Sequence, residues 1–390
     1  MDNAPNGMDH TAGATNGTAT NGTAAGGPIG EALRFAEGFF QRRLAEENLT
    51  EQNGASGAHQ HRAHQYLLRR GYGPGVIEDY GLGWAPDSWD ALLGAATSEG
   101  VSRQALVEAG LIKPRTSGGH YDRFRGRLIF PLYSRRGISQ DGGPQDGIPL
   151  GFAGRRVSET DLPGEEHSGE EHSGEDEPEV GEAPKYINSP ETGRYHKKEY
   201  LYGLWRAAPA IEAVGTAIVT EGYTDVITLQ QEGIRNVVAS SGTALTKAQA
   251  AMISSVADTA VFAYDPDTAG VRAAIRGMKR AVAAGLAPKA VVLPEGLDPH
   301  AFCRSRGLRE TRSYLEKRVG GLGALLKWAS ENGIYDPEPS LLGEIRQAAN
   351  KAPTEALRQS LLLEASRHLR ASDRELFSGG RPPGSIGADP

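Results

Sequence analysis

The 390-residue sequence predicts three structured parts in series: an α+β N-terminal subdomain, an α/β domain with a parallel sheet, and a C-terminal helical subdomain. Short β-rich segments bounded by Gly and Pro indicate the first part. Apolar runs of strand length that alternate with helix-length segments indicate the second, and helical periodicity indicates the third. With 38% hydrophobic residues, the chain can bury a proper core, which excludes disorder throughout.

Residues 1–28 consist mainly of Asn, Gly, Thr and Ala, and this composition predicts a solvated tail. The N-terminal subdomain is expected over 29–213. It begins with helical spacing of the apolar residues Leu33, Ala36, Phe39, Phe40 and Leu44. The later segments RLIFPLYSR and IPLGFAGRRV have the composition of strands, so this part is predicted to be mixed.

An acidic insertion is expected at 158–183, where the unit GEEHS repeats and almost nothing apolar can be buried. Residues 157–184 contain eleven Asp and Glu and no Lys or Arg, and residues 1–28 add two more acids. The whole chain has a net charge of −7, so the remainder without these thirteen acids has a charge of +6. A mildly basic folded part is compatible with a nucleic-acid partner.

The α/β domain is expected over 214–300, where TAIVTE, NVVASS, AVFAYD and AVVLPE alternate with helical stretches. This order predicts parallel strands joined by right-handed crossovers. Helices are expected over 301–377, followed by a tail at 378–390.

The single cysteine, Cys303, excludes an internal disulfide and a Cys-rich zinc site within this sequence. The first residues lack the basic and apolar regions of a signal peptide, and no apolar run approaches the ~18 residues of a membrane helix. A cytoplasmic protein without a membrane partner is therefore expected.

Two predicted strands end in carboxylates: IVTE ends at Glu221, and VFAYD ends at Asp265, with Asp267 two residues later. Because parallel strands end at one edge of a sheet, these three carboxylates are expected to converge. Mg²⁺ prefers such hard oxygen ligands and would offset their mutual repulsion. The alternative is that Glu221 caps a helix N-terminus and that Asp265 and Asp267 lie in a polar turn, without a metal. The spacing leaves both interpretations open.

Three motifs in this region resemble the successive signatures of the TOPRIM domain. They are EGYTD (Glu221 to Asp225), SSGTALT (Ser240 to Thr246) and DPDTAG (Asp265 to Gly270). Upstream, YDRFRGRLIFPL, GFAGRRV and KYINSPET followed by YHKKEYLYGL resemble the catalytic core of bacterial DnaG-type primases. The resemblance extends over residues 33–298.

This resemblance implies synthesis of short RNA primers on a single-stranded DNA template from ribonucleoside triphosphates, with Mg²⁺ or Mn²⁺ as cofactor. It implies that Glu221, Asp265 and Asp267 are catalytic and hold the metal ions. Asp225 and Asp298 are expected to support these metal-binding residues. Metal ions in such a site neutralise the triphosphate and aid attack of the primer 3′ hydroxyl on the α-phosphate.

A cationic wall is expected beside this acidic site. Arg123, Arg125 and Arg127 alternate in RFRGR, so an extended segment would point them to one face. From composition alone, a salt-bridged strand surface is the more common outcome. The resemblance instead implies a nucleotide- and template-binding groove, formed by Arg125, Arg127, Arg155, Lys185 and Lys197, with contacts from Tyr186 and Asn188.

Two other functions use part of the same pattern. A TOPRIM nuclease or topoisomerase-like enzyme would cleave phosphodiesters at the acidic site, and a non-catalytic protein would keep only the single-stranded-DNA surface. DnaG-type primases usually also carry a zinc module and a helicase-interaction domain. Because this sequence has no Cys-rich module, we expect extension of a primer to be easier than initiation, with a replicative helicase or a separate zinc-bearing protein as candidate partners.

Overall fold

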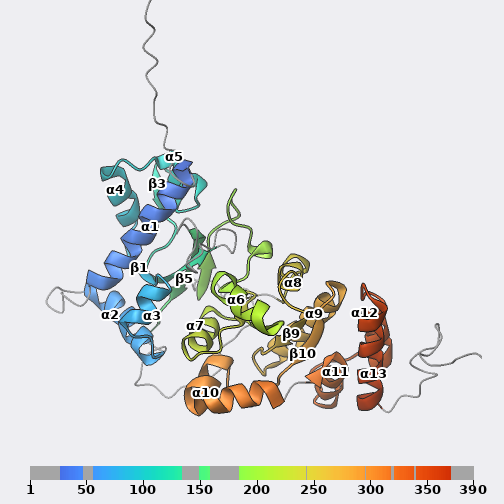
Figure 1. Ribbon diagram of the computed structural model, residues 1–390. Coiled ribbons are helices and arrows are strands. Elements are labelled where there is room, and N and C mark those ends of the chain that lie inside the picture. The colour runs from blue at the N-terminus through green and yellow to red at the C-terminus, as the bar shows by residue number, and fades with distance from the viewer. Residues whose placement is uncertain are drawn as a thin grey trace, which may run out of the picture.

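The computed structural model describes residues 27–46, 56–133, 149–158, 184–242, 244–294, 296–317, 320–337 and 340–369. The predicted tails and the acidic insertion lie outside these residues except at their edges. An N-terminal subdomain, a central α/β domain and a group of C-terminal helices follow one another across the molecule (Figure 1), which confirms the predicted fold class.

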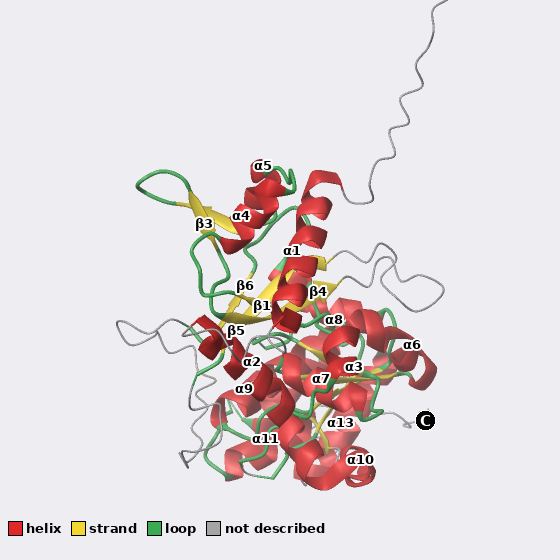
Figure 2. Ribbon diagram, turned by 90° about the vertical axis from the view of Figure 1, so that its left-hand side faces the viewer, coloured by secondary structure: helices red, strands yellow, loops and turns green. Residues whose placement is uncertain are grey.

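The N-terminal subdomain contains an antiparallel sheet with the strand order β1-β4-β5-β6 (Figure 2), and helices pack on both of its faces. Its helices are α1 (Gly27–Ala45), α2 (Ser56–Arg69), α3 (Pro74–Asp79), α4 (Ala91–Ser98) and α5 (Arg103–Glu108). The sheet strands are β1 (Gly83–Ala85), β4 (Arg127–Tyr133), β5 (Pro149–Arg156) and β6 (Tyr186–Asn188), and a separate hairpin pairs β2 (Ile112–Pro114) with β3 (His120–Asp122).

The apolar stripe of α1 forms the core of this subdomain. Phe40 packs edge-on against Phe124 and Phe152, with ring centroids 6.4 and 5.5 Å apart. The helix also lies so close to β1 that a Cβ on Gly83 would come within 2.7 Å of the Phe40 backbone. The helical spacing read from the sequence therefore identified the buried face of α1.

The central domain contains a sheet with the order β11-β10-β9-β7-β8, in which β7 to β10 are parallel. Its strands are β7 (Thr216–Thr220), β8 (Val237–Ala239), β9 (Thr259–Phe262) and β10 (Ala287–Ala290), with β11 (Gly320–Gly321) antiparallel at the edge. The helices are α6 (Leu204–Val214), α7 (Tyr223–Gln231), α8 (Lys247–Ser254) and α9 (Thr268–Ala283), and the 3₁₀-helix η3 (Lys197–Glu199) precedes them.

Both faces of this parallel sheet are buried, as continuous apolar strands require. Val219 and Phe262 pack in the core formed with α8 and α9, whereas their strand neighbours Ile218 and Val261 belong to the core on the opposite face. That second core contains α7, α10 (Pro299–Lys317) and residues of the N-terminal subdomain. The two subdomains therefore share one hydrophobic core.

The C-terminal helices α11 (Leu322–Glu331), α12 (Leu341–Ala349) and α13 (Glu355–Leu369) pack together beside α9. In this group, the Lys279 ammonium of α9 contacts the buried Glu344 carboxylate of α12. None of the helices in the described part of the chain is both long enough and apolar enough to cross a membrane.

Candidate active site

The carboxyl ends of β7 and β9 lie side by side because these two strands pair directly in parallel. Glu221 follows β7, and Asp265 follows β9 after two further residues. The Glu221 Oε1 atom accepts a hydrogen bond from the Asp265 backbone N–H, with an N–O distance of 3.3 Å. The strand ends thus bring together two of the motifs that the sequence analysis singled out.

Helix α9 begins directly against this pair. A Cβ on Gly270 would lie 2.4 Å from the Asp265 carbonyl oxygen and 2.7 Å from Glu221 Oε1, so no larger residue fits there. The glycine of DPDTAG is therefore explained by close packing of the first turn of α9 on the acidic residues. Burial, followed by the charge of Asp267, raises the pKa of Glu221 to about 7.

Asp267 is the N-cap of α9, and its Oδ1 atom accepts a hydrogen bond of 2.6 Å from the Gly270 N–H. Asp298 holds the corresponding position before α10, where its Oδ1 accepts from the Ala301 N–H at 2.5 Å. Asp267 and Asp298 are thus the helix caps, whereas the metal-free alternative had placed a cap at Glu221. Capping and metal binding are compatible, since a carboxylate has two oxygens and about four acceptor sites.

Asp225 is buried in the first turn of α7 and is held by two backbone donors. Gly222 N–H donates to its Oδ2 at 3.0 Å, and His300 N–H donates to its Oδ1 at 3.2 Å. Burial raises the pKa of Asp225 well above its ordinary value, and the charges of Asp298 and Asp265 raise it further. Asp225 is thus electrostatically linked to Asp298 and Asp265.

Five carboxylates gather at this edge, but the described residues contain no group of three or more His, Cys, Asp or Glu arranged to hold one metal ion. The donor set nevertheless fits a divalent cation. Its oxygens are hard ligands, and burial, followed by neighbouring carboxylate charges, raises the pKa of Glu221 and of Asp225. A nearby cation or cationic side chain would favour the ionised form of these carboxylates.

Arg70, which the sequence analysis did not single out, brings such a charge to the acidic edge. Its guanidinium lies 5.1 Å from the ring centroid of Tyr66, and the Arg155 guanidinium lies 4.1 Å from the same centroid. Burial lowers the pKa of Arg70, but Tyr66, Asp298 and Tyr72 outweigh this effect and raise it. No quoted motif contains Arg70, and only its place directly before a glycine at the end of a helix could have drawn attention to it.

The expectation that Arg123, Arg125 and Arg127 share one face is wrong, because the chain turns between β3 and β4, with φ of 56° at Gly126. Arg123 donates twice to the Asn188 carbonyl, at 3.0 and 2.7 Å. Arg127 is 6% exposed and donates to the backbone carbonyls of Gly154, Lys185 and Pro184. Arg127 therefore binds β5 and the segment before β6 together.

Other predicted groove residues lie at the junction of the two subdomains. Tyr223, the first residue of α7, donates from its hydroxyl to Asn188 Oδ1 at 2.9 Å and stacks on Phe130 with centroids 5.4 Å apart. The Tyr186 ring lies 5.8 Å from the Tyr223 ring, and Arg155 is only 1% exposed. These residues connect the β4-β5-β6 sheet to the strand end that carries Glu221.

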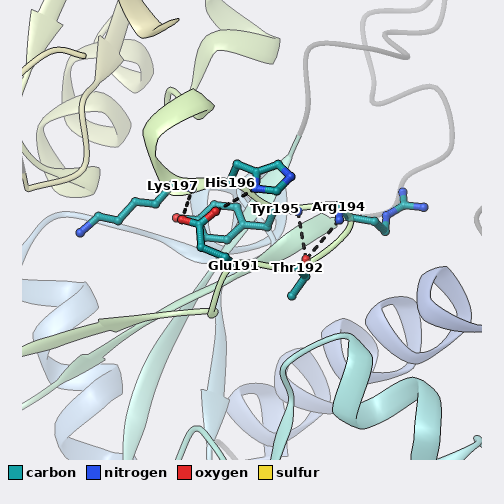
Figure 3. Close-up of polar contacts among 6 residues, drawn as sticks. All are labelled: Glu191, Thr192, Arg194, Tyr195, His196 and Lys197. Carbon is teal, nitrogen blue, oxygen red and sulfur yellow. Dashed lines mark hydrogen bonds and ion pairs between the residues drawn. The ribbon is translucent and has the colours of Figure 1, made fainter. Parts of the chain in front are cut away.

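Lys185 is exposed and Lys197 is half-buried, whereas Arg127 and Arg155 are buried. The loop before Lys197 is ordered by Glu191, whose carboxylate accepts from the Lys197 N–H at 3.1 Å and contacts His196 Nδ1 at 2.8 Å. Thr192 Oγ1 accepts from the backbone N–H of Tyr195 at 3.0 Å. Figure 3 shows the Lys197 side chain extending away from this network. The KYINSPET and YHKK motifs thus form a defined turn that presents a lysine.

A second surface is formed around Trp89, which the sequence analysis did not assign to the groove. Trp89 is 57% exposed, and the Arg125 guanidinium lies 4.0 Å and that of Arg115 5.2 Å from its ring. Tyr121 packs against it at 5.6 Å. We call Trp89, Tyr121, Arg115 and Arg125 the tryptophan platform. An exposed aromatic ring with arginines around it is the surface that stacks unpaired bases.

Comparison with known proteins agrees with this geometry. Residues 50–208 match the family model of the DNA primase catalytic core, N-terminal domain, and residues 218–303 match the Toprim-like model. The DNA primase of Clostridium acetobutylicum is 36% identical over 271 residues, which are 70% of this chain and 40% of that protein. This chain thus contains a DnaG-type primase catalytic core with a Toprim-like domain.

Solved structures agree with the assignment to DnaG-type primases. The Escherichia coli primase catalytic core is 28% identical, with a TM-score of 0.67 over 89% of this chain and 99% of that one. A DnaG primase catalytic domain bound to single-stranded DNA is 28% identical, with a TM-score of 0.65 over 87% and 98%. The chain spans about two fifths of the length of the curated relatives it matches.

Proposed function

We propose that this DnaG-type core synthesises short RNA primers on single-stranded DNA, as a DNA-directed RNA polymerase of the primase type. The observation that carries the proposal is the meeting of Glu221, Asp265 and Asp267 at the carboxyl edge of a parallel sheet, with the Arg70 charge acting on the neighbouring Asp225 and Asp298. This edge is where open α/β sheets bind their ligands. Nucleotidyl transfer needs both charges, since anionic phosphates must be held while their charge is neutralised.

In this proposal Glu221, Asp265 and Asp267 hold Mg²⁺ or Mn²⁺, and Asp225 and Asp298 support them. The bound cation supplies charge neutralisation at the triphosphate and lowers the cost of attack by the primer 3′ hydroxyl. The backbone donors on Asp225 and the cap at Asp267 fix the direction in which these carboxylates approach it. The chain itself thus contributes preorganisation.

We assign the basic residues to two functions, triphosphate binding and template binding. Arg70 and Arg155 lie together at Tyr66 next to the acidic edge, so we assign them to the triphosphate. Lys185 and Lys197, which reach the surface, are assigned to template phosphates. Asn188 Oδ1 is occupied by the Tyr223 hydroxyl, which leaves the amide NH₂ to donate to a substrate acceptor.

The test is a direct assay of the wild-type chain with single-stranded DNA, labelled ribonucleotides and Mg²⁺ or Mn²⁺. Short RNA products are the expected result. A second lane contains end-labelled DNA, so that phosphodiester cleavage without synthesis would identify a nuclease. Binding of DNA with neither product would identify a non-catalytic protein and contradict the proposal.

The partners and the location belong to the same proposal. Single-stranded DNA and ribonucleoside triphosphates are the substrates, and a replicative helicase or a zinc-bearing protein is the proposed protein partner. We propose a cytoplasmic location, where template and nucleotides are both present.

The acidic insertion is expected to weaken template binding. Deletion of residues 158–183 removes eleven negative charges, so single-stranded DNA should bind more tightly at low salt. The Debye length falls from about 30 Å at 0.01 M to about 8 Å at physiological ionic strength, so the gain should largely vanish there. Fluorescence anisotropy with labelled DNA measures both conditions.

A Gly/Ser segment of equal length is the control for loop length in this experiment. A second control replaces the acids of the insertion by Gln and Asn and keeps everything else. Unchanged affinity at low salt in both variants would show that the insertion does not influence the groove.

A further inference from the structure

Tyr72 is a fully buried residue of the N-terminal subdomain that reaches across to the central domain. Its hydroxyl donates to the Thr224 carbonyl of α7 at 2.9 Å and also lies 2.9 Å from Thr228 Oγ1. Thr228 Oγ1 in turn lies 2.6 Å from His300 Nδ1, at the start of α10. Three side chains from three segments thus form one buried chain of hydrogen bonds, which we call the Tyr72 relay.

The direction of these hydrogen bonds follows from counting protons. The single hydroxyl proton of Tyr72 goes to the Thr224 carbonyl, so the Thr228 hydroxyl must donate to Tyr72. The proton of Thr228 is then used, so His300 Nδ1 must carry a hydrogen and donate to Thr228. Burial, with Arg70 and Arg304 nearby, lowers the pKa of His300 to about 3, which agrees with a neutral ring of this tautomer.

The relay is joined to the acidic edge at its far end. The backbone N–H of His300 donates to Asp225 Oδ1, and Thr224 lies directly before Asp225 in α7. The ring contact between Tyr72 and His300, with centroids 6.4 Å apart, adds packing to the same junction. A shift of Tyr72 would therefore be transmitted to the segments that hold Asp225.

At its near end the relay is joined to Arg70 through a rigid turn. Gly71 has φ of 76°, and a Cβ there would lie 2.6 Å from the Arg304 guanidinium, so only glycine fits. The N–H of Tyr72 donates back to the Leu67 carbonyl at 2.9 Å and closes the end of α2. Because the turn is fixed on both sides, anchoring Tyr72 also anchors Arg70.

We propose that Tyr72, Thr228 and His300 are positioning residues that hold Arg70 at the acidic edge for the incoming triphosphate. The inference rests on the proposed function, because it assigns the triphosphate to Arg70. It goes further by naming what sets the distance between the arginine and the carboxylates: a neutral, fully buried relay between the two subdomains.

Tyr72→Phe is the main test, since it removes one hydroxyl and keeps the ring. The matched control is Tyr80→Phe. Tyr80 also lies in the N-terminal subdomain, is also buried, and donates to Gln230 Oε1 at 2.8 Å at the other end of the same helix α7. Tyr72→Phe loses two buried hydrogen bonds across this interface and Tyr80→Phe loses one, so the temperature of thermal unfolding should fall in both variants and somewhat further in Tyr72→Phe.

Only Tyr72→Phe should weaken nucleotide binding. We expect its Kd for Mg²⁺–GTP, measured by calorimetry without turnover, and its KM for GTP to rise about tenfold. The Kd for single-stranded DNA should stay within about twofold of the wild-type value, since the template surface is untouched. Thr228→Val should reproduce the effect, and the double variant should add little to either single change.

Equal Kd values for GTP in Tyr72→Phe, Tyr80→Phe and wild type would overturn the inference. If Tyr72→Phe fails to fold, the Kd of Thr228→Val for GTP is the test, and a value equal to that of the wild type would overturn the inference. A wild-type chain that binds GTP but makes no RNA would contradict the proposed function. The Kd values of the variants for GTP would still test the relay in that case. A wild-type chain that makes RNA and tolerates both relay variants would contradict the relay alone.

Discussion

Asp267→Asn should abolish nucleotide transfer while the stability of the chain falls by no more than about 1 kcal/mol. Asn caps helices as well as Asp does, so the hydrogen bond to the Gly270 N–H can be kept. The lost charge costs α9 only about 0.3–1 kcal/mol of favourable dipole interaction. At a metal-binding carboxylate the same lost charge removes several kcal/mol of transition-state stabilisation, which corresponds to at least about a hundredfold in rate.

Asp267→Ala separates the two roles of this side chain. It removes the cap as well as the charge, so the free energy of unfolding should fall by about 1 kcal/mol in addition to the loss of activity. Ser340→Ala is the matched control, because Ser340 Oγ accepts from the Gly343 N–H at 3.1 Å as the cap of α12. That variant should lose similar stability and keep full activity.

Asp265→Ala should behave like Asp267→Asn. The contacts of residue 265 with Glu221 and with Gly270 involve its backbone, so the alanine variant retains them. Primer synthesis and chemical unfolding of the three aspartate variants would be measured side by side with Ser340→Ala. Wild-type rates in both Asp267→Asn and Asp265→Ala would end the assignment of these carboxylates to metal-dependent transfer.

The acidic half of the site was predictable from the sequence because a simple rule places it. Apolar runs alternating with helices predict parallel strands, and parallel strands end at one edge, so Glu221 and Asp265 meet whatever the loop details are. The caps at Asp267 and Asp298 were also open to inference, since each acid lies three residues before a donor in the first turn of a helix.

The basic half of the site was harder to predict because no periodicity places it. The three arginines of RFRGR were expected on one face, but Gly126 turns the chain and Arg127 bonds to backbone carbonyls instead. Arg70 approaches the acidic edge only through packing of α2 against the central domain, and this contact joins residues 150 or more positions apart. Tertiary contacts of this kind leave no local pattern in one sequence.

The tryptophan platform was missed for a related reason. Trp89 lies in a short loop before α4, where the sequence contains none of the motifs assigned to the groove or the acidic site. Its position is set by Asp122, whose carboxylate accepts from the N–H groups of Leu92 and Leu93 at 2.7 and 3.0 Å and ties α4 to β3. The Trp89 carbonyl accepts from the Asp122 N–H at 2.8 Å. A long-range contact therefore turns the indole outward beside the arginines.

Trp89→Ala should lower the affinity for single-stranded DNA by about 5- to 150-fold, the range for loss of one stacked base. Because the indole is 57% exposed, the free energy of unfolding should change little. Trp89→Phe is the control that keeps an aromatic face and should recover most of the affinity. Leu363→Ala, at another exposed apolar side chain, should leave DNA binding unchanged.

The salt dependence of binding distinguishes stacking from charge at the tryptophan platform. Loss of a stacked base lowers affinity by the same factor at every salt concentration, so Trp89→Ala should leave the slope of log K against log salt unchanged. Arg125→Ala should reduce the magnitude of that slope by about 0.7, the value for one phosphate contact on a single strand. If Trp89→Ala has the same affinity for single-stranded DNA as the wild type at every salt concentration, the template does not bind this surface. In that case Lys185 and Lys197 would carry the template alone, and their variants should account for the whole slope.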